Sequence, residues 1–251
     1  MNAKMRLLVL PSLLAIAIGP LFAAPAPTTP LSAKLTAVFP AAPFLPTLLY
    51  QTVVIDDLDA YIRLQSQINA LIKAQTGIYN LRHIWIGDSV GENTAAMFEA
   101  SQYASATAMN DLETKLEANQ QIAALYAQLK AIRHPGPSVL YKTLRYDGIM
   151  DAGAVLNLTL SCSDDDAVKA ADNLKATLVA AGYNSVKVNL LHAVAGRTTL
   201  THMIVLSLSN RAYLTDLIDA TTDKALLKDW YIMVAKFAPY MQTATYHDVT
   251  D

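Results

Sequence analysis

The chain has 251 residues, of which 53% are hydrophobic and 16% are charged, and its formal net charge is −2. This composition excludes a disordered chain, because it supplies enough apolar surface to form a core. Lys and Arg are scattered rather than gathered in a stripe, so we expect no nucleic acid partner. Cys162 is the only cysteine, so no disulfide forms within the chain and packing supplies its stability.

Residues 1–24 have the layout of a secretory signal peptide. Lys4 and Arg6 precede an apolar run over 7–22, and alanines follow at positions 23, 24 and 26. A run this short, interrupted by two prolines, is not long enough to span a bilayer. We therefore predict cleavage, a periplasmic or secreted location, and no stable membrane insertion after cleavage.

Six of the eleven prolines lie between positions 25 and 46, which predicts an extended spacer over residues 25–47. After the spacer, hydrophobic periodicity predicts the order strand, helix, strand, strand, helix, strand. The sequence GDSVGEN at 87–93 predicts a hairpin loop between the second and third strands. The predicted strands are 48–55, 78–86, 94–103 and 139–146, and the predicted helices are 58–75 and 106–132, the latter as one piece or two.

The same element order recurs in the second half of the chain. A constant shift of about 105 positions relates the two halves, a length typical of a duplicated domain. Gly77 falls on Gly182 at a helix end, and Gly91 falls on Gly196 in a hairpin loop, where the backbone needs glycine. We predict two repeats, 48–149 and 150–251. The second has strands at 154–162, 184–192, 199–208 and 240–247, with helices at 165–180 and up to residue 237.

The strand-into-helix segments MFEASQYASATAMNDL (97–112) and MIVLSLSNRAYLTDL (203–217) carry a family resemblance. They resemble the third strand and second helix of antibiotic-biosynthesis monooxygenase-like and stress-responsive barrel domains, which belong to the dimeric α+β barrel superfamily. The resemblance covers 48–251 and implies an α+β fold, in which two tandem ferredoxin-like βαββαβ sheets meet face to face and close a barrel. That superfamily includes cofactor-free monooxygenases, cyclases, isomerases and haem-bearing chlorite dismutases, so the fold does not select a reaction.

The expected chemistry depends on which residues share a sheet face. If the numbers of facing residues in the second and third strands sum to about 180, then Tyr79, His83, Trp85 and Glu99 share one face. His83 and Glu99 would then form a general base held by a carboxylate, and Tyr79 or Trp85 would stack on a flat ligand. The alternative is that this face lies under the helices, where these residues belong to the core.

The opposite face carries Arg82, and the repeat places Lys187 on the equivalent face of the second half. If this face lines the barrel, the two cations suit a carboxylate or enolate on a ligand. His202 is the only residue we name as a haem ligand, on family analogy alone. No two histidines show the helical or hairpin spacing of a zinc site, so we predict no metal and no cofactor. We place His247, near the C-terminus, at the surface.

The leading hypothesis is an exported protein that binds a small apolar, cyclic ligand in the barrel and converts it without a cofactor, as a cyclase, isomerase or monooxygenase. One rival is a non-catalytic carrier or sensor with the same pocket. Another is a structural or interaction protein whose barrel is filled by side chains, and haem binding ranks after these. A homodimer of two barrels is compatible with each hypothesis.

Overall fold

The computed structural model describes residues 45–76, 82–89, 97–148, 153–196, 199–223 and 225–248. The predicted signal peptide and most of the spacer lie outside these ranges, as do Tyr79, Gly77 and Gly91. Within them, no helix is both long enough and apolar enough to cross a bilayer.

The element order is strand, helix, strand, strand, two helices, strand, and this order occurs twice, which confirms the predicted repetition. The strands are β1 (Thr47–Ile55), β2 (His83–Ser89), β3 (Met97–Tyr103), β4 (Arg133–Arg145), β5 (Ala154–Leu160), β6 (Lys187–Gly196), β7 (His202–Leu208) and β8 (Met241–Asp248). The helices are α1 (Leu58–Thr76), α2 (Ala106–Ala118), α3 (Gln120–Lys130), α4 (Asp164–Ala180), α5 (Arg211–Asp223) and α6 (Lys228–Val234).

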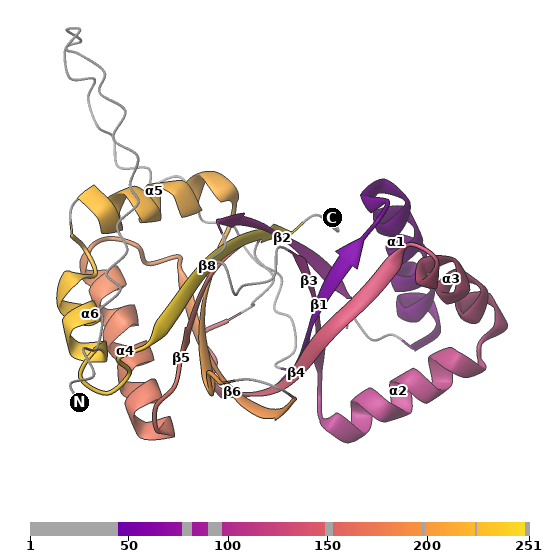
Figure 1. Ribbon diagram of the computed structural model, residues 1–251, viewed down its shortest axis with the longest axis horizontal. Coiled ribbons are helices and arrows are strands. Elements are labelled where there is room, and N and C mark those ends of the chain that lie inside the picture. The colour runs from indigo at the N-terminus through magenta and orange to yellow at the C-terminus, as the bar shows by residue number, and fades with distance from the viewer. Residues whose placement is uncertain are drawn as a thin grey trace, which may run out of the picture. The chain divides into compact units, whose positions relative to one another are not determined.

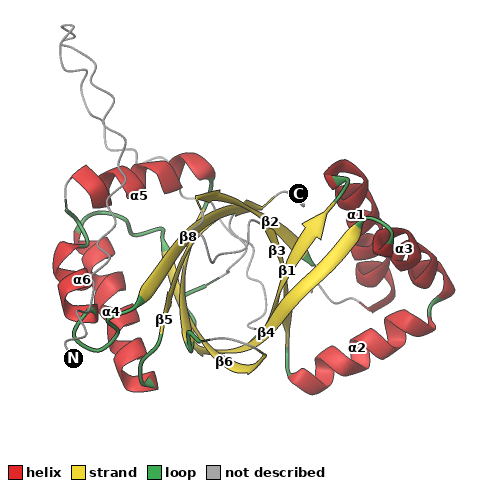
Figure 2. Ribbon diagram, in the orientation of Figure 1, coloured by secondary structure: helices red, strands yellow, loops and turns green. Residues whose placement is uncertain are grey.

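The eight strands form one closed antiparallel barrel in the order β1-β3-β2-β8-β5-β7-β6-β4. Each half contributes four neighbouring strands in the ferredoxin-like order, and the β2–β8 and β4–β6 pairs join the halves. The helices lie outside the strands, with α1–α3 on one side and α4–α6 on the other (Figures 1 and 2). Because side chains alternate across a strand, every second strand residue faces the lumen and the others face the helices.

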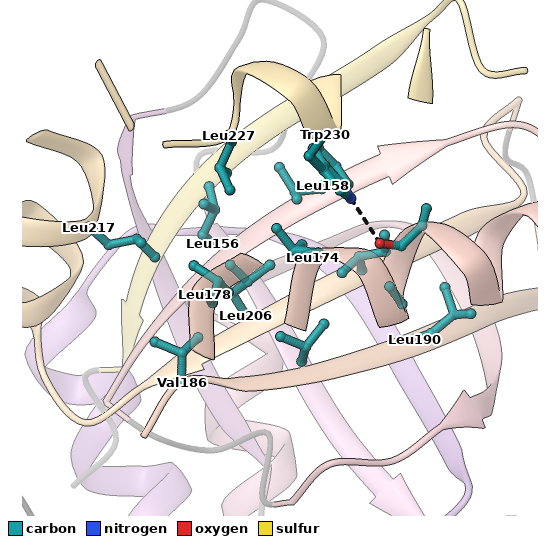
Figure 3. Packing of buried hydrophobic residues seen from close by; sticks show 14 of the residues in the cluster. Leu156, Leu158, Leu174, Leu178, Val186, Leu190, Leu206, Leu217, Leu227 and Trp230 are labelled. Carbon is teal, nitrogen blue, oxygen red and sulfur yellow. Dashed lines mark hydrogen bonds between the residues drawn. The ribbon is translucent and has the colours of Figure 1, made fainter. Parts of the chain in front are cut away.

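Each helical layer packs on the outer face of its own half of the barrel. In the second half, Leu158 and Leu206 from the strands pack against Leu174 and Leu178 of α4, and all four residues are fully buried (Figure 3). Trp230 of α6 closes this cluster and donates its indole N–H to the Ala170 carbonyl oxygen at 2.8 Å. A buried indole N–H needs such an acceptor, so this bond fixes α6 against α4.

A third apolar cluster fills the lumen and includes the aromatic rings of Tyr50, Trp85, Phe98, Tyr141 and Tyr246. Phe98 stacks on Tyr50 with ring centroids 4.3 Å apart and meets the edge of Tyr246 at 4.6 Å. Trp85 lies nearly parallel to Phe98 at 6.0 Å. These offset and edge-to-face arrangements are the favourable ones for aromatic pairs, so the lumen wall is well packed rather than loosely lined.

The helical stretch predicted over 106–132 is two helices, which confirms the two-piece alternative. Asn119 separates them with an extended backbone (φ −86°, ψ 111°). Its side-chain oxygen accepts a hydrogen bond from the amide of Ile122 at 3.0 Å and thereby caps α3.

Strand β4 begins six residues before the predicted strand, at Arg133 rather than Val139. It includes Pro135 and Pro137, which lie before the predicted strand. Over these residues β4 pairs with β1, while its pairing with β6 starts at Val139. Proline lacks an amide hydrogen but is tolerated where a strand is paired on one side only, which explains why the strand continues through this segment.

Candidate functional site

The register of the β2–β3 hairpin differs from the predicted register by an odd number of residues. His83 pairs with Ala100, and Trp85 pairs with Phe98. An odd shift moves a whole strand's side chains to the opposite face. The prediction that His83 and Glu99 share one sheet face is therefore wrong: His83 lies on the lumen face, whereas Glu99 lies on the outer face beneath the helices.

The carboxylate partner of His83 is Asp248, the last residue of β8. The Nδ1 atom of His83 lies 2.5 Å from Oδ2 of Asp248, and the two side chains are 12% and 3% exposed. Asp248 pairs with Trp85 across the β2–β8 joint, so it belongs to the lumen face as His83 does. A carboxylate in this position holds the imidazole in one orientation and tautomer, as expected for a general base.

The lumen next to this pair contains a partly open cavity of about 30 Å³. That volume holds about two water molecules, well below the roughly 300 Å³ of a typical ligand pocket. The apolar lining consists of Leu48, Tyr50, Trp85, Phe98, Ala100, Val155, Met203 and Val205. Gln102 and Asn157 add polar groups, so the cavity is mostly apolar with a few polar positions.

Two asparagines on the lumen face of the second half have unsatisfied polar atoms. Oδ1 of Asn157 and Nδ2 of Asn189 are buried and have no hydrogen-bond partner among the residues that the structure describes. Both residues flank Val205 of β7 on neighbouring strands. Buried polar atoms are normally paired with protein, water or ligand, so these two atoms can accept or donate a hydrogen bond to water or to a bound molecule.

The phenols of the lumen remain protonated far above neutral pH. Burial raises the pKa of Tyr141 and of Tyr246 to about 12. Burial, with a further contribution from Tyr246, raises the pKa of Tyr50 well above its ordinary value. These hydroxyl groups therefore act as neutral hydrogen-bond donors rather than as bases.

Glu99 belongs instead to an ionic cluster on the outer face. It is 2% exposed, and it accepts hydrogen bonds from Arg133 and from the hydroxyl of Tyr61 on α1. Nη1 of Arg82 lies 3.8 Å from its second oxygen. Burial alone would raise the pKa of Glu99, but the hydrogen bonds from Arg133 and the charges of Arg82 and Arg133 outweigh it and lower the pKa. The cluster is thus a structural ion pair rather than a base.

Arg82 and Lys187 do not form the predicted cationic pair. Arg82 belongs to the outer cluster around Glu99. Lys187, at the start of β6, shares the lumen face with Asn189 and Leu191. The reason is again the β2–β3 register, because the face equivalent to that of Lys187 carries His83 and Trp85 in the first half.

His202 lies on the outer face of β7 and is 1% exposed. Its partner across the β6–β7 hairpin is His192, so the expectation that no two histidines share hairpin spacing is wrong. Both imidazoles contact Asp164 at the start of α4. Burial lowers the pKa of His202, while the hydrogen bonds from His202 and His192 lower the pKa of Asp164.

Haem does not fit the described residues. His202, the ligand named from the sequence, points away from the lumen toward Asp164. The lumen is occupied by packed aromatic rings, and the cavity of about 30 Å³ has no room for a macrocycle.

No family model and no curated protein sequence matches the chain. Solved structures do match. A candidate monooxygenase from Lactobacillus acidophilus NCFM superposes with a TM-score of 0.52 at 12% identity, covering 82% of this chain and 94% of that one. A second candidate monooxygenase, from Fusobacterium nucleatum subsp. nucleatum, superposes with a TM-score of 0.51 at 12% identity, covering 81% of this chain and 92% of that one. An anthrone oxidase-like protein superposes with a TM-score of 0.49 at 12% identity, covering 82% of this chain and 91% of that one.

The chain therefore has the fold of the dimeric α+β barrel proteins, as the resemblance in its sequence implied. At this level of identity the likeness shows the fold alone. The site residues must be interpreted from their own geometry.

Two functional features were missed by the sequence-based reasoning. Asp248 follows the last predicted strand directly, but only closure of the barrel brings it to His83. The His192–His202 pair could have been found by aligning the apolar outer faces of 184–192 and 199–208, because Leu190 faces Ile204 in the same register.

Proposed function

We propose that the barrel lumen binds a small, planar, largely apolar molecule, and that His83 removes a proton from it with no cofactor. The observation that carries this proposal is the His83–Asp248 pair, which lies on the lumen face beside Trp85 and Ala100, two residues that line the cavity. An imidazole oriented by a carboxylate in an apolar site is a typical general base.

The chemistry needs only the groups of this chain. With Nδ1 of His83 held by Asp248, Nε2 is the atom that takes a proton from an acidic C–H or O–H of the ligand. The electron pair left behind is delocalised into an adjacent carbonyl as an enolate, and the imidazolium is stabilised by Asp248. Returning the proton to a different atom completes an isomerisation. In a cyclisation the enolate carbon instead bonds to a second carbonyl carbon of the ligand and the resulting alkoxide takes the proton, whereas an oxygenation would also require dioxygen.

The polar atoms on the opposite wall orient the ligand. The unpaired buried atoms of Asn157 and Asn189 can bond to a carbonyl or hydroxyl group while the ring lies against Trp85. A ring needs more space than the cavity of about 30 Å³ provides. Tyr50 and Gln102 line the cavity and are only half-buried, so rotation of these side chains is the route by which space opens.

The small cavity also favours a second candidate function, a non-catalytic protein whose barrel is filled by its own side chains. The two functions differ in whether the lumen takes up a ring. Replacing Trp230 by Phe leaves Trp85 as the only tryptophan, because the chain has two. In this variant we expect phenol, 2-naphthol or 2-tetralone to quench Trp85 fluorescence in a saturable way.

A substitution inside the lumen tests where the probe binds. Ala100→Leu narrows the cavity and should weaken binding at least tenfold, whereas Val54→Leu, at a side chain that is 60% exposed, should leave binding unchanged. Absence of saturable quenching with every probe supports the filled barrel and contradicts the binding proposal.

The role of His83 is tested with the α-hydrogens of 2-tetralone, which exchange with deuterium oxide when a base removes them. We expect the protein to accelerate this exchange, His83→Gln to abolish the acceleration without weakening binding, and Asp248→Asn to reduce it. Exchange in His83→Gln equal to that of the unsubstituted protein would leave the lumen as a binding site only.

A further inference from the structure

Three side chains that are well separated in the sequence converge at the opposite end of the β6–β7 hairpin from Lys187. His192 of β6 and His202 of β7 are direct cross-strand partners, and their ring centroids lie 4.8 Å apart. Oδ1 of Asp164 lies 2.7 Å from Nδ1 of His192 and 3.0 Å from Nε2 of His202. One oxygen and two imidazole nitrogens, all within 4.8 Å of one another, therefore point at a common position.

These separations suit ligands that share one cation. Zinc binds imidazole nitrogen and carboxylate oxygen at about 2.0–2.2 Å, which places neighbouring ligand atoms about 3–3.5 Å apart. The observed separations of 2.7 and 3.0 Å are close to this range, so small rotations of the Asp164 and His192 side chains suffice to admit an ion.

The three ligands come from well-anchored elements. Asp164 is the first residue of α4, whose N-terminus is capped by Ser163 through a bond to the amide of Asp166 at 3.2 Å. Nδ1 of His202 lies 2.9 Å from Oγ1 of Thr201. Metal-binding histidines generally use their second nitrogen in this way, which fixes the tautomer and leaves the other nitrogen as the ligand.

We propose that Asp164, His192 and His202 bind a divalent cation of the zinc class. Two imidazoles with one carboxylate select zinc and its first-row neighbours over calcium and magnesium, which prefer oxygen ligands. Asp164 and His192 are 55% and 33% exposed, so the remaining coordination positions face solvent and are filled by water. The site lies on the outer face of the barrel and is independent of the function proposed for the lumen.

Charge near the site supports cation binding. Asp165 and Asp166 share the first turn of α4 with Asp164, which adds negative charge beside the three ligands. Asp166 is occupied by the hydroxyl of Ser163 at 2.7 Å and is not counted as a ligand. Cys162, two residues before Asp164, is not part of the cluster and is not counted as a ligand.

The first test is calorimetric titration of zinc chloride into the full chain after treatment with a chelator. We expect one equivalent of zinc to bind, and His192→Ala or Asp164→Asn to weaken binding at least tenfold. His134→Ala is the matched control, because His134 forms a comparable 2.8 Å pair with Asp56 on an exposed surface. Equal affinity in His192→Ala and the unsubstituted protein, or no zinc binding at all, overturns the proposal.

The second test identifies the ligand atoms. Cobalt(II) should give visible d–d bands without a thiolate charge-transfer band, and Cys162→Ser should leave the spectrum unchanged. A thiolate band that disappears in Cys162→Ser would overturn the proposed ligand set. Circular dichroism of His192→Ala checks that the variant is folded, and magnesium or calcium should not compete with zinc at tenfold excess.

Discussion

Arg133 holds the carboxylate of Glu99 from two nitrogens, on the outer face of the barrel beneath α1. The same guanidinium group donates to the side-chain oxygen of Gln51 at 2.6 Å. Because Glu99 is 2% exposed, its charge is removed from water and depends on these partners. This relationship connects β1, β3 and β4, so its loss should affect both the stability of the barrel and the pH dependence of that stability.

Replacing Arg133 by Leu should lower the free energy of unfolding by about 3 kcal/mol, because it leaves a buried carboxylate with weaker compensation from Arg82 and Tyr61. Urea denaturation followed by circular dichroism measures the change. Arg211→Ala is the control, since Arg211 pairs with Asp88 but is 65% exposed, and it should cost no more than about 1 kcal/mol. Equal losses in the two variants would show that the Glu99 pair contributes no more than a surface pair.

The Glu99 pair also predicts a pH dependence. The folded protein holds the pKa of Glu99 below its ordinary value of 4.5, so the unfolded state binds the proton more readily. The resulting stabilisation is fully present above about pH 4.5 and is lost as the pH falls through the lower folded pKa. Denaturation midpoints measured across this acidic window should fall less steeply in Glu99→Gln, and an identical slope in both proteins would contradict the assignment.

Two glycines with left-handed backbones should respond differently to alanine. Gly182 (φ +91°) ends α4, where its amide and that of Tyr183 bond back to Val179 and Leu178, and an added Cβ meets nothing within 4 Å. Gly196 (φ +99°) ends β6, where a Cβ would lie 2.3 Å from the carbonyl oxygen of Ser138.

We therefore expect Gly182→Ala to lower the free energy of unfolding by about 1–2 kcal/mol from backbone strain alone. Gly196→Ala should cost about 1–3 kcal/mol more, because the β4–β6 joint must also move to relieve the contact. Thermal unfolding of the two variants side by side measures the difference. A smaller loss for Gly196→Ala than for Gly182→Ala would show that the joint adapts freely.

We propose export on the basis of residues 1–24, and cleavage of the signal peptide during secretion tests this proposal. Expression of the full chain with a bacterial secretion system should give a periplasmic product whose intact mass lacks the apolar run over 7–22. Lys4→Glu combined with Arg6→Glu should slow export by removing the positive charges that precede that run. An unprocessed product that remains in the cytosol would contradict the signal peptide.

A homodimer of two barrels predicts a definite molar mass. Light scattering after gel filtration gives the molar mass directly, and a mass twice that of the processed chain supports the homodimer. A mass equal to one chain shows that closure within a single chain is sufficient, because the two halves already complete each other.

The sequence determined which elements form and in what order. Strand and helix periodicities are local, so they predicted the repeated order, and the constant shift between the halves predicted the duplication. The two four-stranded sheets pack against each other because each has an apolar lumen face that only the other half covers. These conclusions survived errors of several residues at strand ends, including the early start of β4 at Arg133.

Only the tertiary structure decided which chemical groups meet. A one-residue change in hairpin register exchanges the two faces of a strand, so the correct residue types still produced the wrong partner for His83. Asp248 reaches His83 through the β2–β8 joint, and Asp164 reaches His192 and His202 through the docking of α4 on the sheet. Such contacts join residues far apart in the chain, and they are set by barrel closure and packing rather than by local pattern.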